Sequence, residues 1–203
     1  MNTYGIVILA AGASTRLGQP KQLLQYQGES LIQRIARIAV DAVHSPVVVV
    51  LGAHAGKISP QLSSIPVQTV YNEDWTTGIA SSIKKGLQAV LDISPKIGNV
   101  LFAVCDQPHI STDLFLDMIT EKKTTNSPII ACSYDNSLGT PVLFSRKLFH
   151  ELMQLKDAEG AKSVMQLHPD SVKAVLFPKG NVDIDWLHDL AALKVQHYTN
   201  AER

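Results

Sequence analysis

The chain has 203 residues, 45% of them hydrophobic, and its 18 basic and 18 acidic residues give a formal charge of zero. This composition is typical of a globular protein with a substantial core, and the balanced charge argues against nucleic-acid binding, which needs a clustered basic surface. No stretch reaches the roughly 18 apolar residues of a membrane span. Cys105 and Cys132 lie far apart and lack the spacing of a disulfide framework or zinc site, so we expect buried thiols in a reducing, cytoplasmic compartment.

Four short segments rich in valine and isoleucine are predicted to be parallel strands. They are expected to be apolar on both faces, as in strands that helices cover on both sides. The segments are Tyr4–Leu9, Val47–Leu51, Val67–Tyr71 and Val100–Val104. The first of them lacks a basic segment before it and ends near a glycine, so it predicts a strand and not a signal peptide.

Amphipathic segments between these strands are predicted to be helices. The first has capping-box spacing at Ser30 and Gln33. The second runs from about Gly78 to Leu91, with Ile79, Ile83, Leu87 and Leu91 on one face. The third follows Ser111, and its inward residues are expected to be Leu114, Phe115, Met118 and Ile119. Strands that alternate with helices imply right-handed βαβ units and one twisted sheet.

The second half of the chain has a less regular pattern. It predicts strands at Ile129–Cys132 and Val142–Phe144, joined through a turn that contains Asp135, Asn136 and Gly139. Helices are expected from about Lys147 to Leu155 and near Ala161–Leu167, then a strand at Val172–Phe177 and a closing helix at Trp186–Leu193. The whole pattern predicts a single-domain, three-layer α/β/α sandwich around a Rossmann-like, mostly parallel sheet.

The loop after the first strand, LAAGASTRLGQPK, is the most informative segment. Three successive positions have little or no side chain, namely Ala10, Ala11 and Gly12. Backbone N–H groups can therefore approach an anion closely, and Arg16 and Lys21 add cations suited to phosphate oxygens. Ligands of open α/β sheets bind beyond the carboxyl ends of the strands, where this loop lies. The loop matches neither of two well-known phosphate-binding motifs, GxxxxGK[ST] and GxGxxG. The alternative to a phosphate-binding loop is a flexible turn with two surface cations.

Carboxylates in two places suggest a metal site. Asp106 ends the buried strand in the sequence CDQP, and Mg²⁺ on phosphates is usually held by one or two carboxylates plus substrate oxygens and water. In the segment Val182–Trp186, strand-like alternation would place Asp183 and Asp185 on one side and bury Ile184. The alternatives are a turn cap at Asp106 and an N-cap pair before the closing helix.

The first loop, CDQP and the segment NEDWTTGIASS at Asn72–Ser82 together resemble the MobA-like NTP transferase family. The similarity is nearest to its molybdenum cofactor cytidylyltransferases, and sugar-phosphate nucleotidyltransferases are more distant. It runs from residue 4 to about 190 and implies the nucleotide-diphospho-sugar transferase fold. It also implies a domain over residues 1–195, with an NTP-binding half at 1–110 and an acceptor-binding half at 111–195, followed by a frayed tail at 196–203.

The resemblance implies roles for individual residues. The nucleotide contacts would be Leu9, Ala10, Ala11, Gly12, Arg16, Lys21, Gly78, Ser81 and Ser82. The catalytic residues would be Lys21, Arg16 and Asp106. Mg²⁺ (or Mn²⁺) would be bound by Asp106 with Asp185, and Asp183 is the second choice. The acceptor contacts would be Gly139, Pro141 and Lys162; the loop before Lys162 has a shifted acid and lysine where the family has arginine, which leaves acceptor recognition open.

The resemblance implies a metal-dependent nucleotidyltransferase that moves NMP from an NTP to a molybdopterin-type phosphorylated acceptor and releases pyrophosphate. CTP is the favoured donor and GTP the alternative, and a molybdoenzyme would be a fitting partner. A sugar-phosphate or methylerythritol-phosphate acceptor is a more distant alternative. An alternative of another class is a non-catalytic nucleotide- or cofactor-binding chaperone module, which would need the first loop but not the carboxylates.

Overall fold

The computed structural model describes residues 3–43, 45–184 and 189. The strands are β1 Tyr4–Ala10, β2 Gln25–Tyr26, β3 Glu29–Ser30, β4 Val47–Leu51, β5 Gln68–Tyr71, β6 Asn99–Val104, β7 Ile129–Tyr134, β8 Ser137–Ser145 and β9 Val172–Leu176. The α-helices are α1 Leu31–Ala42, α2 Ala55–Ile58, α3 Ile79–Ile93, α4 Thr112–Thr125, α5 Phe149–Gln154 and α6 Ala161–Leu167.

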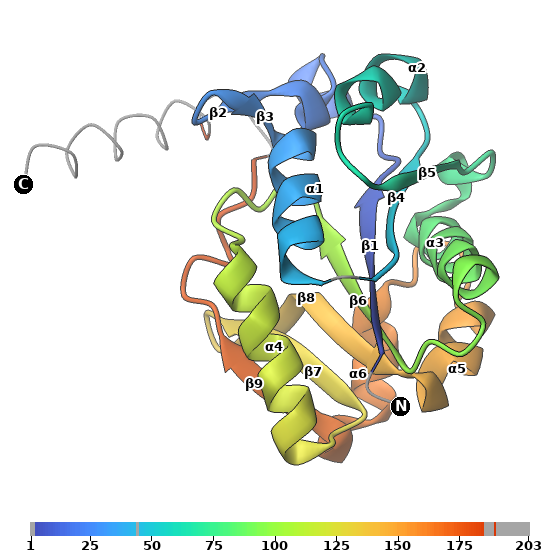
Figure 1. Cartoon of the computed structure of the whole chain (residues 1–203), viewed down its shortest axis with the longest axis vertical. Helices are drawn as coiled ribbons and strands as arrows, with labels where there is room; N and C mark the ends of the chain where they lie inside the picture. The colour runs from blue at the N-terminus through green and yellow to red at the C-terminus, as the bar shows by residue number, and fades with distance from the viewer. Residues whose placement is uncertain (1–2, 44, 185–188, 190–203) are drawn as a thin grey trace, which may run out of the picture.

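Seven of these strands form one sheet in the order β5-β4-β1-β6-β8-β7-β9. All neighbouring pairs are parallel except the two pairs that β8 makes with β6 and β7. Helices α1 and α4 lie on one side of the sheet, and α3 and α5 lie on the other (Figure 1). The predicted three-layer α/β/α architecture with a mostly parallel sheet is confirmed.

Two hydrophobic cores fill the spaces between the sheet and its two helical layers. Side chains alternate along a strand, so Ile6 and Ile8 of β1 enter the core beneath α1 and α4, whereas Val7 enters the core beneath α3. The predicted capping box begins α1, because Ser30 Oγ accepts from the Gln33 amide and the Ser30 amide donates to Gln33 Oε1 at 3.2 Å. Helix α4 buries all four residues expected to point inward, Leu114, Phe115, Met118 and Ile119.

Three expectations differ from the structure. Strand β5 lies beside β4 at the edge of the sheet that the described residues form, and this edge position leaves its side chains mostly exposed. Ile79 is 41% exposed since it begins α3 beside an open cavity, so it does not share the buried face of that helix. The turn between β7 and β8 consists of Asp135 and Asn136, both with positive φ, and Gly139 lies within β8.

The observed bounds of α5, α6 and β9 lie within a few residues of the predicted ones. The closing helix expected at Trp186–Leu193 falls outside the described residues, apart from Asp189. Within the described ranges, no helix is both long and apolar enough to cross a membrane.

Helix α3 approaches the sheet closely at Gly86. A Cβ at this position would lie 2.3 Å from Val7 Cγ1 and 2.9 Å from Val50 Cγ2. We expect Gly86→Ala to lower the free energy of unfolding by about 1–3 kcal/mol through overpacking, measured by urea denaturation. Gly56→Ala in α2 is the matched control, because a Cβ there meets nothing within 4 Å. Equal effects of the two substitutions would contradict this explanation.

Candidate functional site

A cavity of about 260 Å³ lies at the carboxyl ends of β1 and β6. This is the position at which open α/β sheets bind ligands. We call it the apical cavity. It is lined by Leu9, Ala10, Ala11, Gly12, Lys21, Gln22, Trp75, Gly78, Ile79, Ser82, Val104, Cys105 and Asp106. Most of the residues that were predicted from the first loop and CDQP therefore meet in one place.

The loop after β1 is held in shape by a buried glutamine. Gln22 is 1% exposed, and its Nε2 donates to the carbonyl oxygens of Ala10 at 2.9 Å and Gly12 at 3.0 Å. With these two carbonyls bonded to Gln22, the small-residue segment has a fixed path at the cavity edge. No sequence pattern predicts a role for Gln22, because a single polar residue in a loop has no periodicity that reveals its burial.

Contacts from neighbouring segments fix the rest of this loop. Ser14 has a left-handed backbone conformation, and its Oγ accepts from the Lys21 amide at 3.1 Å. The residues after β4 support the other side, where the Ala53 amide donates to the Ala11 carbonyl at 3.1 Å. Arg16 lies on an exposed 3-10 turn at Thr15–Leu17 and does not line the apical cavity.

Lys21 and Asp106 form an ion pair between Nζ and Oδ2 at the cavity. Both side chains are largely buried, with 19% and 17% of their surfaces exposed. The other carboxylate oxygen, Asp106 Oδ1, is buried and has no hydrogen-bond partner in the described part of the chain. A buried carboxylate oxygen without a donor is costly, so this atom is suited to a cation.

The acidic segment after residue 181 lies against Asp106. The Ile184 amide donates to the Asp106 carbonyl at 3.0 Å, and the Ile184 side chain is fully buried in a small core with Leu17 and Leu24. Asp183 is exposed and Ile184 is buried, which agrees with the predicted alternation for these two residues. Asp185, the preferred second metal ligand, lies outside the described residues.

The start of α3 forms another wall of the apical cavity. Gly78 has φ +127°, and a Cβ there would lie 2.2 Å from the Asp157 carbonyl oxygen, so only glycine fits this junction. Ser82 lines the cavity. Ser81 instead lines an adjoining hollow, and both serine hydroxyls accept from Nδ2 of buried Asn72, at 2.8 Å for Ser81 and 3.0 Å for Ser82.

The residues predicted to contact an acceptor are not in the apical cavity. Gly139 and Pro141 lie in β8 on either side of Thr140. Thr140 Oγ1 donates to Oε1 of Gln107, the residue after Asp106, at 3.4 Å. Gln107 Nε2 also donates to the Gly180 carbonyl at 2.7 Å. Lys162 is exposed in the first turn of α6 and does not line the cavity. The structure thus brings β8 next to Asp106 through one side chain and leaves Lys162 apart.

The donor chemistry around Asp106 fits a hard cation shared with a ligand. No three His, Cys, Asp or Glu side chains gather into a metal cage within the described ranges. Mg²⁺ commonly needs only one or two carboxylates because substrate oxygens and water complete its shell. Asp106, with its unpartnered Oδ1, meets this smaller requirement.

The fold and this site define an open α/β protein with a small-residue loop and a carboxylate at the tips of adjacent strands. Residues 6–172 match the MobA-like NTP transferase domain, and the chain belongs to this family of nucleotidyltransferases. The expected family resemblance is therefore confirmed.

Two curated relatives have names from different reaction classes. The chain is 38% identical over 106 residues to nicotine blue oxidoreductase from Paenarthrobacter nicotinovorans, an alignment that spans 52% of this chain and 50% of the relative. It is 23% identical over 188 residues to a probable molybdenum cofactor guanylyltransferase from Bacillus cereus (strain Q1), covering 92% and 90% of the two chains. The first alignment thus covers only about half of that relative's length.

Among solved structures, the chain is similar to Rv0371c from Mycobacterium tuberculosis H37Rv. The TM-score is 0.78 at 28% identity, and the match covers 94% of this chain and 97% of the other. Another structure of Rv0371c is a complex with manganese, with a TM-score of 0.70, 25% identity and the same two coverages.

Both cysteines are expected to be unreactive in the folded protein. Burial and then the neighbouring Asp106 charge raise the pKa of Cys105 to about 12, with Lys21 opposing them, and burial raises the pKa of Cys132 to about 12. The thiolate is the reactive form, so almost none is present at pH 8. We expect a chromogenic disulfide reagent to label neither thiol quickly in native protein and both in denaturant. A fast-reacting thiol in the native state would be evidence against this environment.

Proposed function

We propose that this chain transfers NMP from an NTP to a molybdopterin-type phosphorylated acceptor and releases pyrophosphate, with CTP as the favoured donor. The observation that carries the proposal is the meeting of Lys21 and Asp106 at a cavity edged by the small-residue loop. The Lys21 ammonium suits a triphosphate, and the Asp106 carboxylate suits the cation that accompanies the triphosphate. Family membership supports the transfer reaction in general.

In the proposed reaction an acceptor phosphate oxygen attacks the α-phosphorus of the NTP, and the bond from that phosphorus to the pyrophosphate oxygen breaks. A phosphate nucleophile is ionised near neutral pH, so the chain does not need to remove a proton from it. The role of the protein is then positioning and charge stabilisation. The backbone of Ala10–Gly12 cradles the triphosphate, Lys21 neutralises its charge, and Arg16 reaches it from the exposed turn.

We assign metal binding to Asp106 together with Asp185, or Asp183 as the second choice. The unpartnered Asp106 Oδ1 and the contact of Ile184 with the Asp106 backbone support this assignment. Mg²⁺ or Mn²⁺ bound there would neutralise charge on the phosphates during transfer. The manganese complex of Rv0371c supports a divalent cation in a similar protein.

We assign the remaining recognition to both halves of the chain. Gly78, Ser81 and Ser82 would contact the nucleoside from residues 1–110, and Gly139, Pro141 and Lys162 would contact the acceptor from residues 111–195. CTP is favoured by the likeness of the first loop and CDQP to cytidylyltransferases. The guanylyltransferase name of full-length relatives makes GTP the competing donor, and a molybdoenzyme that receives the product is the partner that this reaction implies.

The test of this function is a panel of the four NTPs with molybdopterin and Mg²⁺. We expect the dinucleotide product and equimolar pyrophosphate with CTP, and slower or no turnover with the other three. Faster turnover with GTP would correct the base while retaining the reaction class. Nucleotide binding without pyrophosphate from any NTP would contradict the transfer reaction and support the non-catalytic module.

The role of Asp106 is tested by Asp106→Asn, which keeps the shape of the side chain but removes its charge. We expect kcat to fall at least about 10²-fold, because charge stabilisation at such sites typically has an effect of this size. Asp117→Asn on the exposed face of α4 is the control and should retain full activity. Wild-type turnover by the well-folded Asp106 variant would refute the assignment.

The positioning role of Gln22 predicts a separate effect. Gln22→Ala removes the donor to two loop carbonyls, so we expect the KM for the NTP to rise about tenfold with a smaller change in kcat, since one or two hydrogen bonds of this kind are involved. Exposed Gln25→Ala should leave both constants unchanged. A fall in kcat alone, with the same KM, would show that the loop does not depend on Gln22 for nucleotide binding.

A further inference from the structure

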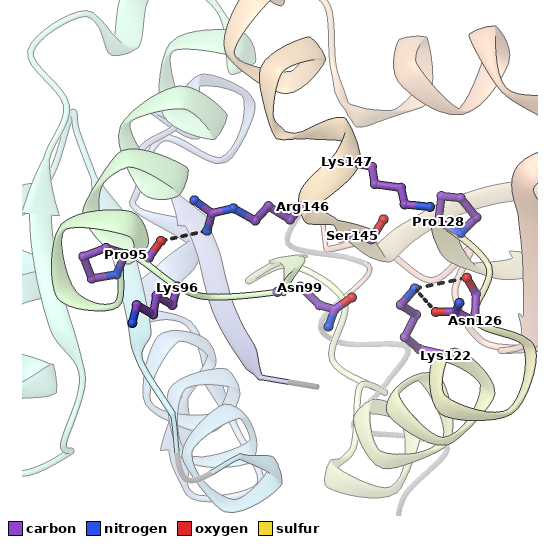
Figure 2. Close-up of a pocket in the computed structure, with 10 residues that line it drawn as sticks. Pro95, Lys96, Asn99, Lys122, Asn126, Pro128, Ser145, Arg146 and Lys147 are labelled. Atoms are coloured by element: carbon purple, nitrogen blue, oxygen red, sulfur yellow. Dashed lines mark hydrogen bonds between the residues drawn. The ribbon is translucent and has the colours of Figure 1, made fainter. Parts of the chain in front are cut away.

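A second cavity, of about 550 Å³, opens at the end of the sheet opposite to the apical cavity. It lies where β6 begins and β8 ends, and Figure 2 shows its lining. We call it the basal cavity. Its lining consists of Pro95, Lys96, Gly98, Asn99, Lys122, Asn126, Pro128, Ser145, Arg146 and Lys147. Strand β6, from Asn99 to Val104, separates the two sites by roughly 17 Å at the usual rise per residue.

The lining of the basal cavity is strongly basic. It includes four cations, Lys96, Lys122, Arg146 and Lys147, and no acidic residue. Burial and then the neighbouring charge of Lys147 lower the pKa of Lys122. The protein therefore concentrates like charges here without a carboxylate in the lining to balance them, and an anion would relieve their repulsion.

Two of these cations are fixed by the backbone. Arg146 Nη1 donates to the carbonyls of Pro95 at 2.8 Å and Ile97 at 2.9 Å, and a guanidinium has five N–H donors in total. Lys122 Nζ donates to the Ser127 carbonyl at 2.9 Å and to the carbonyl and Oδ1 of Asn126 at 3.3 and 3.4 Å, so it contributes its charge to the cavity while its three N–H groups are already bonded. These contacts (those to Pro95 and Asn126 are drawn in Figure 2) hold both side chains in place, so little additional ordering is needed when a ligand binds.

Independent evidence for a ligand comes from two buried polar side chains. Asn99 and Ser145 are directly paired on β6 and β8, and they are only 3% and 7% exposed. Asn99 Oδ1 and Ser145 Oγ are both buried without a hydrogen-bond partner in the described part of the chain. In Figure 2 the carboxamide oxygen of Asn99 points to the space between Asn99 and Lys122. Each unsatisfied group costs about 1–3 kcal/mol, so a ligand that bonds to both would offset a real penalty.

We propose that the basal cavity binds a phosphate group, with Asn99 and Ser145 at its base and the surrounding cations around it. The cations require an anion, and Asn99 Oδ1 is an acceptor that requires a donor because Asn99 Nδ2 already donates to the Thr3 carbonyl. Hydrogen phosphate meets both requirements near neutral pH, since it combines two negative charges with one O–H group. Sulfate has the same shape and charge but no O–H, so the site should discriminate between them.

The experiment is calorimetric titration of the full chain with phosphate and with sulfate at matched ionic strength. We expect one saturable phosphate site and sulfate binding at least about tenfold weaker, the effect of one hydrogen bond to a buried group. Asn99→Leu should abolish this preference, and a thermal melt of the variant establishes that it is folded. Absence of saturable binding, or equal affinity for the two anions, would overturn the proposal.

Matched lysine variants separate this site from the apical cavity and from general surface charge. Exposed Lys147→Gln should weaken phosphate binding at least about fivefold, whereas Lys123→Gln, on α4 outside the basal cavity, should change it less than about twofold. Lys21→Gln should leave this binding intact. Loss of phosphate binding in the Lys21 variant with retention in the Lys147 variant would place the anion in the apical cavity and overturn the proposal.

The source of the phosphate group is decided by one further titration, with glycerol 2-phosphate, whose hydroxyl groups can supply the O–H donor that its doubly ionised phosphate lacks. Tighter binding of the organic ester than of inorganic phosphate identifies a phosphorylated small molecule as the ligand. Tighter binding of inorganic phosphate identifies the free ion. Because none of these experiments requires nucleotidyl transfer, they test the basal site independently of the proposed reaction.

Discussion

The contact between Lys21 and Asp106 depends on the parallel pairing of β1 with β6. These residues are 85 positions apart in the chain, yet each follows the carboxyl end of its strand. Because Leu9 pairs with Val104, both strands end at the same level of the sheet. A loop on one strand can then share a ligand with the carboxylate on its neighbour. An antiparallel partner in place of β6 would have put the acid at the far end of the sheet.

Buried polar side chains hold the loops of the apical site in one shape. Gln22 bonds to the small-residue loop, Asn72 bonds to the first turn of α3, and Gln107 connects CDQP to the loop at Gly180. An amide can donate to carbonyls that no secondary structure satisfies, and it carries no charge that would compete for a phosphate or cation. The site is therefore built from neutral supports around the Lys21–Asp106 ion pair, and these supports add no further charge beside it.

The same sheet presents a second basic region at its other end. The antiparallel strand β8 produces it, because its last residue, Ser145, pairs with the first residue of β6, Asn99. The apical site thus lies where the parallel strands β1 and β6 end, and the basal cavity lies where the antiparallel strand β8 ends beside the start of β6. The similar sequences carry oxidoreductase and guanylyltransferase names, and a shared fold does not by itself fix a reaction.

Local patterns in the sequence determined the strands β1, β4 and β6, the capped start of α1, the inward face of α4, and the small-residue loop with its cations. Each of these features depends on residues that are neighbours along the chain, so spacing and residue type are sufficient to predict it. The edge position of β5, the burial of Gln22, the fit of Gly78 against Asp157 and the pairing of Asn99 with Ser145 were decided only by the tertiary structure. These features are contacts between distant segments, and no local periodicity records which surfaces will meet once the sheet has formed.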